Sequence, residues 1–524
     1  MAVAPHALAS QTALAVLRDG GNAVEAMVAC AASIAVVYPH MNGLGGDSFW
    51  LISQPQPGGT EQVIGIDASG AAAQGVTPAH YAGRSAIPFR GADACITVAG
   101  TVAGWQQALD ISRSQLGGQL PLQRLLSDAI DYARHGHPVT TSQHRNTAHK
   151  RAELQGVPGF ADTFLPGGHV PAVGSLFTQP RLADTLEHLA RAGLDDFYRG
   201  DLARSMAADL EAIGSPLRLA DLQAHQAVLR TPLVLQHSAG RIYNMPPPTQ
   251  GLVSLIILGL MDRLGVQHMD HLSPDYVHAA VESVKQAFAV RDRHITDPAH
   301  MQVDPASFLA SDALDAMAAR IDPAQAAAWG QGKGPADTVW MGVIDGNGCA
   351  VSMIQSIYHE FGSGVVLPTS GINWQNRGAS FSLQPEHINV LAPGKKPFHT
   401  LNPALAHLHD GRSMVYGNMG GDGQPQSQSA VFTRTVSLGL NPQDAISAPR
   451  WLLGRTWGQS SDTLKLESRF PAATIEALRA RGHEVEVLGE WDETFGHAGC
   501  LLGRPDGSLE GGFDPRSDGG VAAF

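Results

Sequence analysis

Thr338 is the residue whose type and position could do chemistry most directly. It follows a loose segment of Gly, Pro and small polar residues, 332–337, and begins an alternating strand pattern that continues to Ile344. If the peptide bond between Asp337 and Thr338 breaks, the new α-amine lies beside the Thr hydroxyl and can take its proton. One residue then supplies both nucleophile and base. Thr is also an ordinary β-branched strand residue, so this pattern alone leaves a purely structural role open.

A hairpin is expected to position this threonine. Residues 345–348 (Asp-Gly-Asn-Gly) follow the first strand and form a strong turn signal, because Gly and Asn tolerate positive φ. A second strand is predicted over 350–358, and it carries Ser356 and Tyr358 at its far end. The exposed loop for processing is predicted over 324–335, directly before the first strand.

Two glycine-rich turns follow predicted structural elements. A strand over 414–418 continues into Gly420-Gly421, and consecutive glycines can turn two backbone N–H groups inward to form an anion-binding nest. A generic turn is the alternative. Residues 40–47 (His-Met-Asn-Gly-Leu-Gly-Gly-Asp) precede another strand, but their spacing matches neither a P-loop nor a dinucleotide fingerprint.

The remaining elements form a mixed pattern of helices and strands. Helical spacing over 8–18 ends at two glycines, and Asn22 can cap a second, almost entirely apolar helix that continues to Val37 and is therefore expected to be buried. Residues 98–330 are predicted to be mainly helical. Near the end of the chain the patterns predict a strand at 464–468, a helix at 472–481 and a strand at 485–488.

The order and content of these segments resemble the γ-glutamyltranspeptidase family of N-terminal-nucleophile hydrolases over nearly the whole chain. The resemblance implies an α+β fold, a four-layer αββα sandwich of two stacked, mainly antiparallel sheets. It implies self-cleavage into a large subunit, 1–337, and a small subunit, 338–524, which together form one integrated domain. Thr338 would be the nucleophile, Ser356 would orient its amine, and Gly420 and Gly421 would form the oxyanion hole.

Several positions depart from the pattern that the family uses for γ-glutamyl substrates. Ser69 stands where an Arg pairs with the substrate α-carboxylate, and Ser380 stands where an acidic residue holds the α-ammonium. Tyr358 replaces an Asn, and His399 and Thr400 replace a Ser pair that contacts the carboxylate. An unpaired charge in a closed pocket is costly, so a γ-glutamyl head group is expected to bind poorly here.

Arg377 offers a different substrate class. It stands near the expected pocket, where family members have Gln, and a planar guanidinium can hold a small carboxylate in a bidentate manner. A surface or interdomain salt bridge is the alternative role. Asn42, Tyr358, His399 and Thr400 are the other predicted substrate contacts. The runs around the two glycine turns look most similar to the oxamate amidohydrolase branch, enzymes of purine-nitrogen recycling that release oxalate and ammonia.

Other functions stay open at this point. Within enzymes the alternatives are a γ-glutamyl hydrolase or transpeptidase and a glutaryl-type acylase, and outside enzymes an uncleaved, inactive binding homologue. No cofactor is expected. The sequence has 23 His, but His407-Leu-His409 and the 268–271 run lack the second cluster or HExxH pattern of a zinc site, so no metal is predicted.

Composition limits the partners. The 524 residues carry 35 Lys+Arg against 48 Asp+Glu, a formal charge of −13, which argues against nucleic-acid and anionic-membrane partners. Four widely separated cysteines favour free thiols over a disulfide framework. The sequence has neither a signal-peptide pattern nor an apolar run long enough to span a membrane, so a cytoplasmic location is expected. The partners expected are a small acid amide and the two subunits of the same precursor, as one heterodimer or as a dimer of heterodimers.

Overall fold

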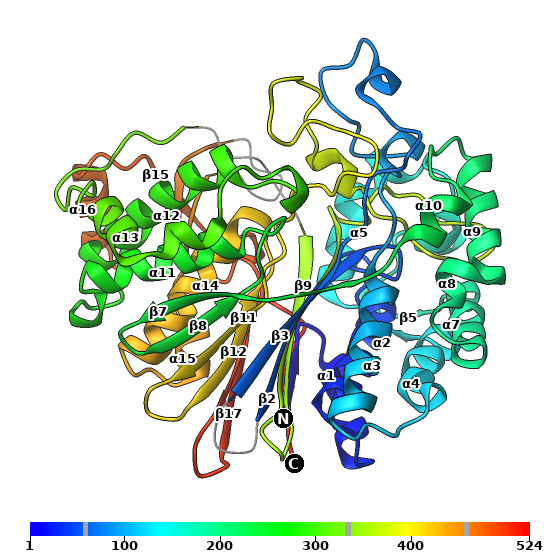
Figure 1. Ribbon diagram of the computed structural model, residues 1–524, viewed down its shortest axis with the longest axis horizontal. Helices are drawn as coiled ribbons and strands as arrows, with labels where there is room; N and C mark the ends of the chain where they lie inside the picture. The colour runs from blue at the N-terminus through cyan, green and yellow to red at the C-terminus, as the bar shows by residue number, and fades with distance from the viewer. Residues whose placement is uncertain (56–60, 331–336, 455–460) are drawn as a thin grey trace.

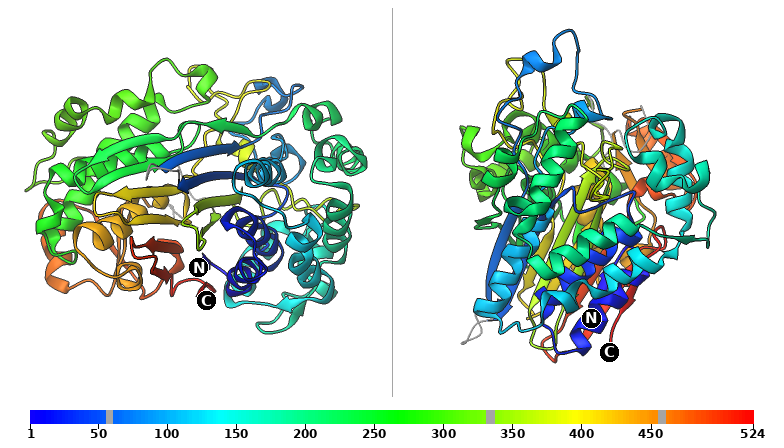
Figure 2. Two further views of the ribbon diagram at one scale, coloured as in Figure 1. Left: turned by 60° about the horizontal axis from the view of Figure 1, so that its bottom comes forward. Right: turned by 90° about the vertical axis from the view of Figure 1, so that its right-hand side faces the viewer.

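The chain folds into two stacked β-sheets that lie between two layers of helices (Figure 1). The structure is a computed structural model that describes residues 1–55, 61–330, 337–454 and 461–524. In Figure 1 the layers follow one another from the blue and cyan helices through both sheets to the green and orange helices, and Figure 2 shows them from two further sides. This is the αββα arrangement that the family resemblance implies.

The first sheet is antiparallel throughout and contains the Thr338 strand near its middle. Its strands, in spatial order, are β18 (Gly520–Ala522), β1 (Ala2–Ala4), β9 (Asp337–Ile344), β10 (Ala350–Tyr358), β2 (Asp47–Pro55), β3 (Glu61–Ala68) and β6 (Val228–Arg230). The predicted hairpin between the first two strands of the 338–524 segment is therefore the β9–β10 pair.

The second sheet is also antiparallel. Its strands, in spatial order, are β17 (Leu509–Phe513), β16 (Ala498–Gly503), β12 (Ser413–Asn418), β11 (Ala404–Leu408), β8 (Gly240–Asn244) and β7 (Leu233–His237). The prediction of a mainly helical 98–330 segment missed β6, β7 and β8. Their signal is short: Leu233 and Leu235 alternate with more exposed neighbours over only five residues.

Smaller sheets lie outside the sandwich. One joins β13 (Trp451–Leu453), β14 (Leu464–Glu467) and β15 (Val485–Leu488), and the other joins β4 (His137–Pro138) and β5 (Leu176–Phe177). The strands predicted at 464–468 and 485–488 are thus confirmed. They pair with each other in parallel, with the predicted helix between them.

Each sheet is covered by its own helices. On the side of the first sheet lie α1 (Ala7–Arg18), α2 (Ala23–Val37), α3 (Thr101–Gln115), α4 (Leu122–His135), α5 (Thr141–Leu154), α6 (Phe160–Phe164), α7 (Pro180–Ala192), α8 (Asp196–Arg199), α9 (Asp201–Ala212) and α10 (Leu219–Ala224). On the side of the second sheet lie α11 (Gly251–Arg263), α12 (Pro274–His294), α13 (Ser311–Ala318), α14 (Gln424–Phe432), α15 (Pro442–Ser447) and α16 (Ala472–Ala480).

Helix α2 shows how local sequence produces this packing. Asn22 caps it, accepting from the backbone N–H groups of Val24 and Glu25, and the Glu25 carboxylate accepts from the Asn22 N–H in return. All fifteen residues of the helix are buried, as expected for a helix that is apolar on every side. The helix packs between α1 and the nucleophile strand β9.

Trp340 fixes strand β9 against the second sheet. Its ring lies against Gly417 of β12 and Gly499 of β16, where an added Cβ would fall 2.0 Å and 2.4 Å from ring atoms. Only glycine leaves room for the indole at these two positions. The buried indole N–H donates to Ser352 Oγ at 2.9 Å, which satisfies its one polar atom.

The segments before and after Thr338 are interleaved. The 1–337 segment supplies β1, β2, β3 and β6 to the first sheet and β7 and β8 to the second, and the remaining strands of both sheets come from 338–524. The two ends of the chain lie close together (Figure 1), since Ala2 pairs with Ala522. Residues 324–330 of the predicted processing loop are mostly exposed and contain no helix or strand, while 331–336 lie outside the described residues.

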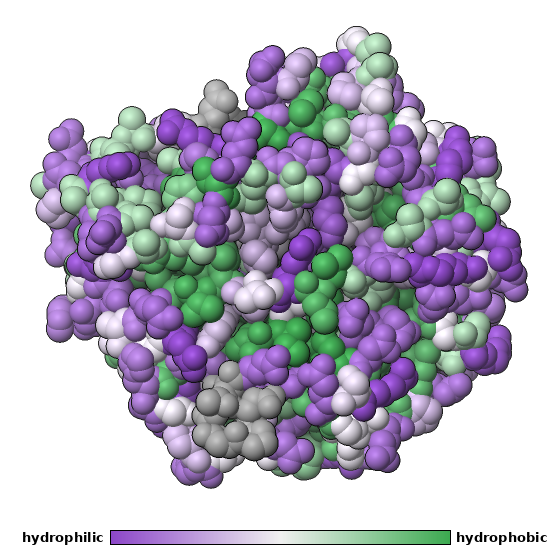
Figure 3. Space-filling view, viewed as in Figure 1, coloured by the Kyte–Doolittle hydropathy of each residue, from purple (hydrophilic) through white to green (hydrophobic). Residues whose placement is uncertain are grey.

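On the face drawn in Figure 3, hydrophilic side chains predominate and hydrophobic ones gather in separate areas. All four cysteines are buried free thiols, as predicted. Among the described helices, none combines the length and the apolar character that a membrane crossing requires.

Candidate active site

Thr338 lies opposite an irregularity in the β9–β10 pairing. Gln355 pairs with Val339, but the next pair joins Tyr358 to Asp337, so Ser356 and Ile357 both stand opposite Thr338. Two residues against one is a β-bulge, a feature that re-aims side chains and is common beside active sites. Thr338 is fully buried, and its Oγ accepts from Gln424 Nε2 at 3.2 Å.

The bulge strains the chain at Tyr358. This residue has a φ of 83°, a left-handed conformation that costs energy for any residue with a Cβ. The Ser356 hydroxyl compensates in part by accepting from the Tyr358 N–H at 2.8 Å. Strain of this kind in a non-glycine residue is concentrated at functional sites. The structure thus brings the predicted residues Thr338, Ser356 and Tyr358 together.

The predicted glycine pair has a backbone conformation that favours glycine. Gly420 and Gly421 have φ values of 117° and 53°, which residues with a side chain rarely adopt. The carbonyl of Gly421 accepts from Gln250 Nε2 at 2.8 Å, and the same amide nitrogen donates to the Thr400 carbonyl at 2.8 Å. Gln250 therefore ties the glycine turn to the loop that carries Thr400.

Arg377 is a charged side chain in the interior of the protein. It is fully buried, and its guanidinium carbon lies 3.9 Å from the centroid of the Tyr358 ring. Its Nη1 reaches Thr400 Oγ at 3.4 Å, whereas within the described part of the chain Nε and Nη2 have no hydrogen-bond partner. Burial lowers the pKa of Arg377 to about 10, so the group remains charged at neutral pH. A surface salt bridge, the alternative role, does not fit this position.

His399 forms a buried pair with Asp47. The distance from His399 Nε2 to Asp47 Oδ2 is 2.9 Å, and both side chains are fully buried. Burial, together with the nearby charge of Arg377, holds the pKa of His399 well below its usual range. Burial also raises the pKa of Asp47 to about 6, so this carboxyl is ionised at neutral pH.

The side chain of Asn42 is hydrogen-bonded within the protein. Its amide nitrogen donates to the carbonyls of Ile34 and Tyr38 at the end of α2, and its oxygen accepts from Gln355 at 2.7 Å. These contacts use the polar atoms of the side chain. We therefore leave Asn42 out of the proposed substrate contacts.

A cavity of about 290 Å³ opens beside these residues. Its lining includes Tyr358, Ser380, Phe398, Thr400 and Asp422. The Asp422 carboxylate also forms a buried ion pair with Arg291 at 2.9 Å, so its charge is compensated by the protein. The cavity has room for a small, polar molecule.

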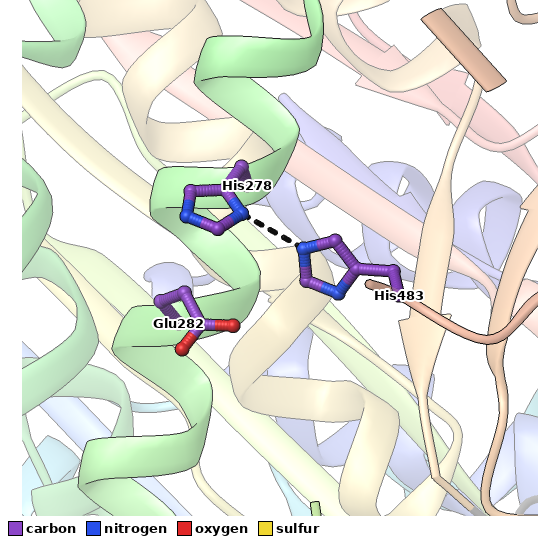
Figure 4. A group of neighbouring side chains, drawn as sticks. All are labelled: His278, Glu282 and His483. Atoms are coloured by element: carbon purple, nitrogen blue, oxygen red, sulfur yellow. Dashed lines mark hydrogen bonds between the residues drawn. The ribbon is translucent and has the colours of Figure 1, made fainter. Parts of the chain in front are cut away.

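A second cluster has side chains of the types that bind metal ions. His278 and Glu282 of α12 and His483 place ligand atoms within 4.8 Å of one another (Figure 4). Each is engaged by protein: His278 contacts His483 and the Asp322 carbonyl, both at 2.8 Å, and Glu282 accepts from Lys285 at 2.6 Å. Lys285 thus already neutralises the carboxylate, and we assign the cluster a structural role.

Lys285→Met is expected to destabilise the protein by about 3–5 kcal/mol, because it leaves the buried carboxylate of Glu282 unpaired. Adding Glu282→Gln should restore most of the loss, since the unpaired charge is then gone. Thermal unfolding of the single and double variants tests this. Equal melting temperatures for wild type and Lys285→Met would contradict the assigned role.

The comparison with known proteins agrees with this geometry. A family model described as Gamma-glutamyltranspeptidase matches residues 9–524. The chain belongs to the γ-glutamyltranspeptidase family. Membership confirms the family resemblance seen in the sequence.

Two family members and one solved structure cover essentially the whole chain. This chain is 60% identical over 524 residues to the oxamate amidohydrolase proenzyme of Klebsiella pneumoniae, and the match covers 100% of this chain and 98% of that protein. It is 41% identical over 528 residues to the glutathione hydrolase-like YwrD proenzyme of Bacillus subtilis, with the same coverage. The crystal structure of cephalosporin acylase from Bacillus halodurans matches with a TM-score of 0.90 at 33% identity. The match covers 100% of this chain and 95% of that one. The predicted N-terminal-nucleophile hydrolase fold is therefore confirmed.

Four site residues of this γ-glutamyltranspeptidase family member were not predicted. Asp47, Gln250, Asn402 and Gln424 connect the loops around Thr338: Asn402 donates to Gln424 Oε1 at 3.2 Å and to the Thr400 carbonyl at 3.0 Å. Local patterns give no sign of most of these contacts, because the Gln250 and Gln424 partners come from segments distant in sequence. Asp47 alone had a signal, since it ends the glycine-rich 40–47 turn.

Proposed function

We propose that the protein is a self-processing amidohydrolase that cleaves a small amide bearing a carboxylate, with oxamate as the substrate. The observation that carries the proposal is Arg377, a buried guanidinium whose Nε and Nη2 have no partner in the described part of the chain. These two nitrogens form one edge of the guanidinium, the arrangement that binds a carboxylate through two parallel hydrogen bonds. The 60% identity to an oxamate amidohydrolase proenzyme supports the same substrate.

The proposed reaction begins with cleavage between Asp337 and Thr338, which divides the chain into a large subunit, 1–337, and a small subunit, 338–524. The freed α-amine of Thr338 takes the hydroxyl proton as Oγ attacks the amide carbonyl. The N–H groups of Gly420 and Gly421 hold the negative oxygen of the tetrahedral intermediate. The intermediate collapses, and the amine returns its proton to the leaving ammonia.

Water completes the reaction. The acyl group remains on Thr338 Oγ as an oxalyl ester, and water, deprotonated by the same amine, hydrolyses it to oxalate. Ser356 is proposed to orient the amine, because the bulge places it opposite Thr338. The proposal keeps two further predictions, a part in purine-nitrogen recycling, which rests on the sequence resemblance, and a cytoplasmic location, which does not.

A γ-glutamyl substrate is the second candidate, since the Bacillus subtilis relative is called glutathione hydrolase-like. Such a substrate needs a partner for its α-ammonium as well as its α-carboxylate. Ser380 Oγ lies 3.0 Å from the carbonyl oxygens of both Arg377 and Phe398, so these two acceptors already take its single hydroxyl proton. Asp422, the acidic group that lines the cavity, is paired with Arg291.

A substrate comparison tests the proposal. Ammonia release from oxamate and p-nitroaniline release from a γ-glutamyl anilide are measured on the same preparation. We expect oxamate to be preferred by at least about 100-fold in kcat/KM, because Asp422 is already paired with Arg291 and would leave the α-ammonium buried without a counter-charge. A higher kcat/KM for the anilide would reject oxamate as the substrate.

A further inference from the structure

Three polar atoms around Arg377 and His399 are buried without a partner. They are Nε and Nη2 of Arg377 and Nδ1 of His399, and none has a hydrogen-bond partner among the residues that the structure describes. Both side chains are fully buried, and Arg377 contacts Thr400, the residue next to His399. Buried polar groups in folded proteins are rarely left unpaired, so three in one place call for a ligand.

The protonation of His399 follows from its contact with Asp47. The Asp47 Oδ1 atom accepts from the N–H groups of Gly70 at 3.0 Å and Gly100 at 3.1 Å, and from Gln375 Nε2 at 3.2 Å. The other oxygen, Oδ2, faces His399 Nε2. An ionised carboxylate can only accept, so Nε2 of His399 carries the ring proton. In the neutral imidazole Nδ1 is then a bare acceptor.

The two donor nitrogens of Arg377 and the acceptor nitrogen of His399 together indicate the chemistry of the ligand. The two donors of Arg377 match the two oxygens of a carboxylate, and the acceptor matches an N–H group. We propose that His399 Nδ1 accepts a hydrogen bond from the primary amide nitrogen of the substrate, and that Asp47 is the positioning residue that keeps His399 in the accepting tautomer. This inference rests on the proposed function and deepens it, because it explains how the site recognises the amide end of a small acid amide.

The expected consequence is a preference for an amide over an ester of the same acid. Monomethyl oxalate has the carboxylate and the reacting carbonyl of oxamate but no N–H. A site that hydrogen-bonds an N–H discriminates against an analogue that lacks it, because the buried acceptor is then left unpaired. The quantity to measure is the ratio of kcat/KM for oxamate to kcat/KM for monomethyl oxalate, from oxalate release after subtraction of spontaneous hydrolysis.

His399→Leu should lower this ratio by about 10- to 100-fold, the range expected when a buried donor loses its acceptor. His399→Asn is the matched control, because its side-chain oxygen can take the place of Nδ1 as an acceptor. It should keep the ratio within about fivefold of wild type, as a neutral hydrogen bond is regained. An unchanged ratio in His399→Leu, with both substrates slowed equally, would overturn the inference and leave His399 a packing residue.

Asp47→Asn tests the tautomer separately. The three donors on Oδ1 hold the amide oxygen of the new side chain in that place, so its NH₂ group points to His399 Nε2. His399 must then accept at Nε2 and carry its proton on Nδ1, which turns the acceptor into a donor. We expect the amide-to-ester ratio to fall by about as much as in His399→Leu. A ratio equal to wild type would show that Asp47 does not set the tautomer and would overturn its part of the proposal.

The same data separate this inference from the function on which it rests. A wild-type protein that hydrolyses neither oxamate nor monomethyl oxalate rejects the proposed function, and the His399 inference with it. A wild-type protein that hydrolyses oxamate, together with variants that leave the ratio unchanged, retains the function and rejects only the role of His399.

Discussion

Thr338→Ala is expected to remain a single uncut chain and to release no ammonia from oxamate above background. The variant loses the hydroxyl that attacks the substrate and, in self-cleavage, the hydroxyl that attacks the preceding peptide bond. The protein should still fold, because Thr338 is a small residue at the start of β9 and the smaller alanine fits in the same space. Gel electrophoresis and an ammonia assay measure both effects.

Thr338→Ser is the matched control for this experiment. It retains a hydroxyl and, after cleavage, an α-amine on the same residue, so it should be processed and keep measurable activity. Cleavage that persists at this bond in Thr338→Ala would contradict the assignment of the hydroxyl. An uncut Thr338→Ala protein with the activity of wild type would contradict the assignment of the nucleophile.

Arg377→Met is expected to lower kcat/KM for oxamate by about 10²- to 10³-fold, in line with the loss of a buried, charge-assisted contact. Arg377→Lys should recover only part of this, because an ammonium keeps the charge but not the planar pair of donors. Burial lowers the pKa of Arg377 to about 10, and the group is charged below that value. The KM of the wild type should therefore rise only as the pH approaches 10.

Stability distinguishes a binding role for Arg377 from a structural one. Within the described residues its Nε and Nη2 have no partner, so wild type carries the cost of an incompletely paired buried charge. Arg377→Met removes that cost and should melt at the same temperature as wild type or above it, although it loses activity. A variant that is both inactive and several degrees less stable would indicate that Arg377 mainly supports the fold.

Local pattern was enough to predict the elements that carry the nucleophile. The Asp-Gly-Asn-Gly turn and the alternation around it gave the β9–β10 hairpin, and the Asn22 cap with its apolar run gave α2. The strands β7 and β8 were missed because five alternating residues are too few to stand out within a long helical region. Their place in the second sheet depends on the pairing of β8 with β11, a distant segment, while β7 pairs with β8.

The site was predictable where one residue or one turn defines the chemistry. Thr338 at a strand start and the Gly420-Gly421 turn belong to this class, and family resemblance supplied their roles. The Asp47–His399 pair joins residues that are 352 positions apart, and the three donors on Asp47 come from three further segments. The burial of Arg377 against Tyr358 depends on the bulge in β10, and the local sequence does not predict that bulge. The contacts of Asn42 with the last carbonyls of α2 were likewise not predictable from its place beside a glycine turn.

In the proposed mechanism Thr338 becomes an N-terminal residue, and its own amine serves as the base. N-terminal sequencing and intact-mass analysis of purified protein, with turnover of oxamate measured on the same sample, test it most directly. We expect two polypeptides, of which the smaller begins at Thr338. A single uncut chain with full turnover would contradict it.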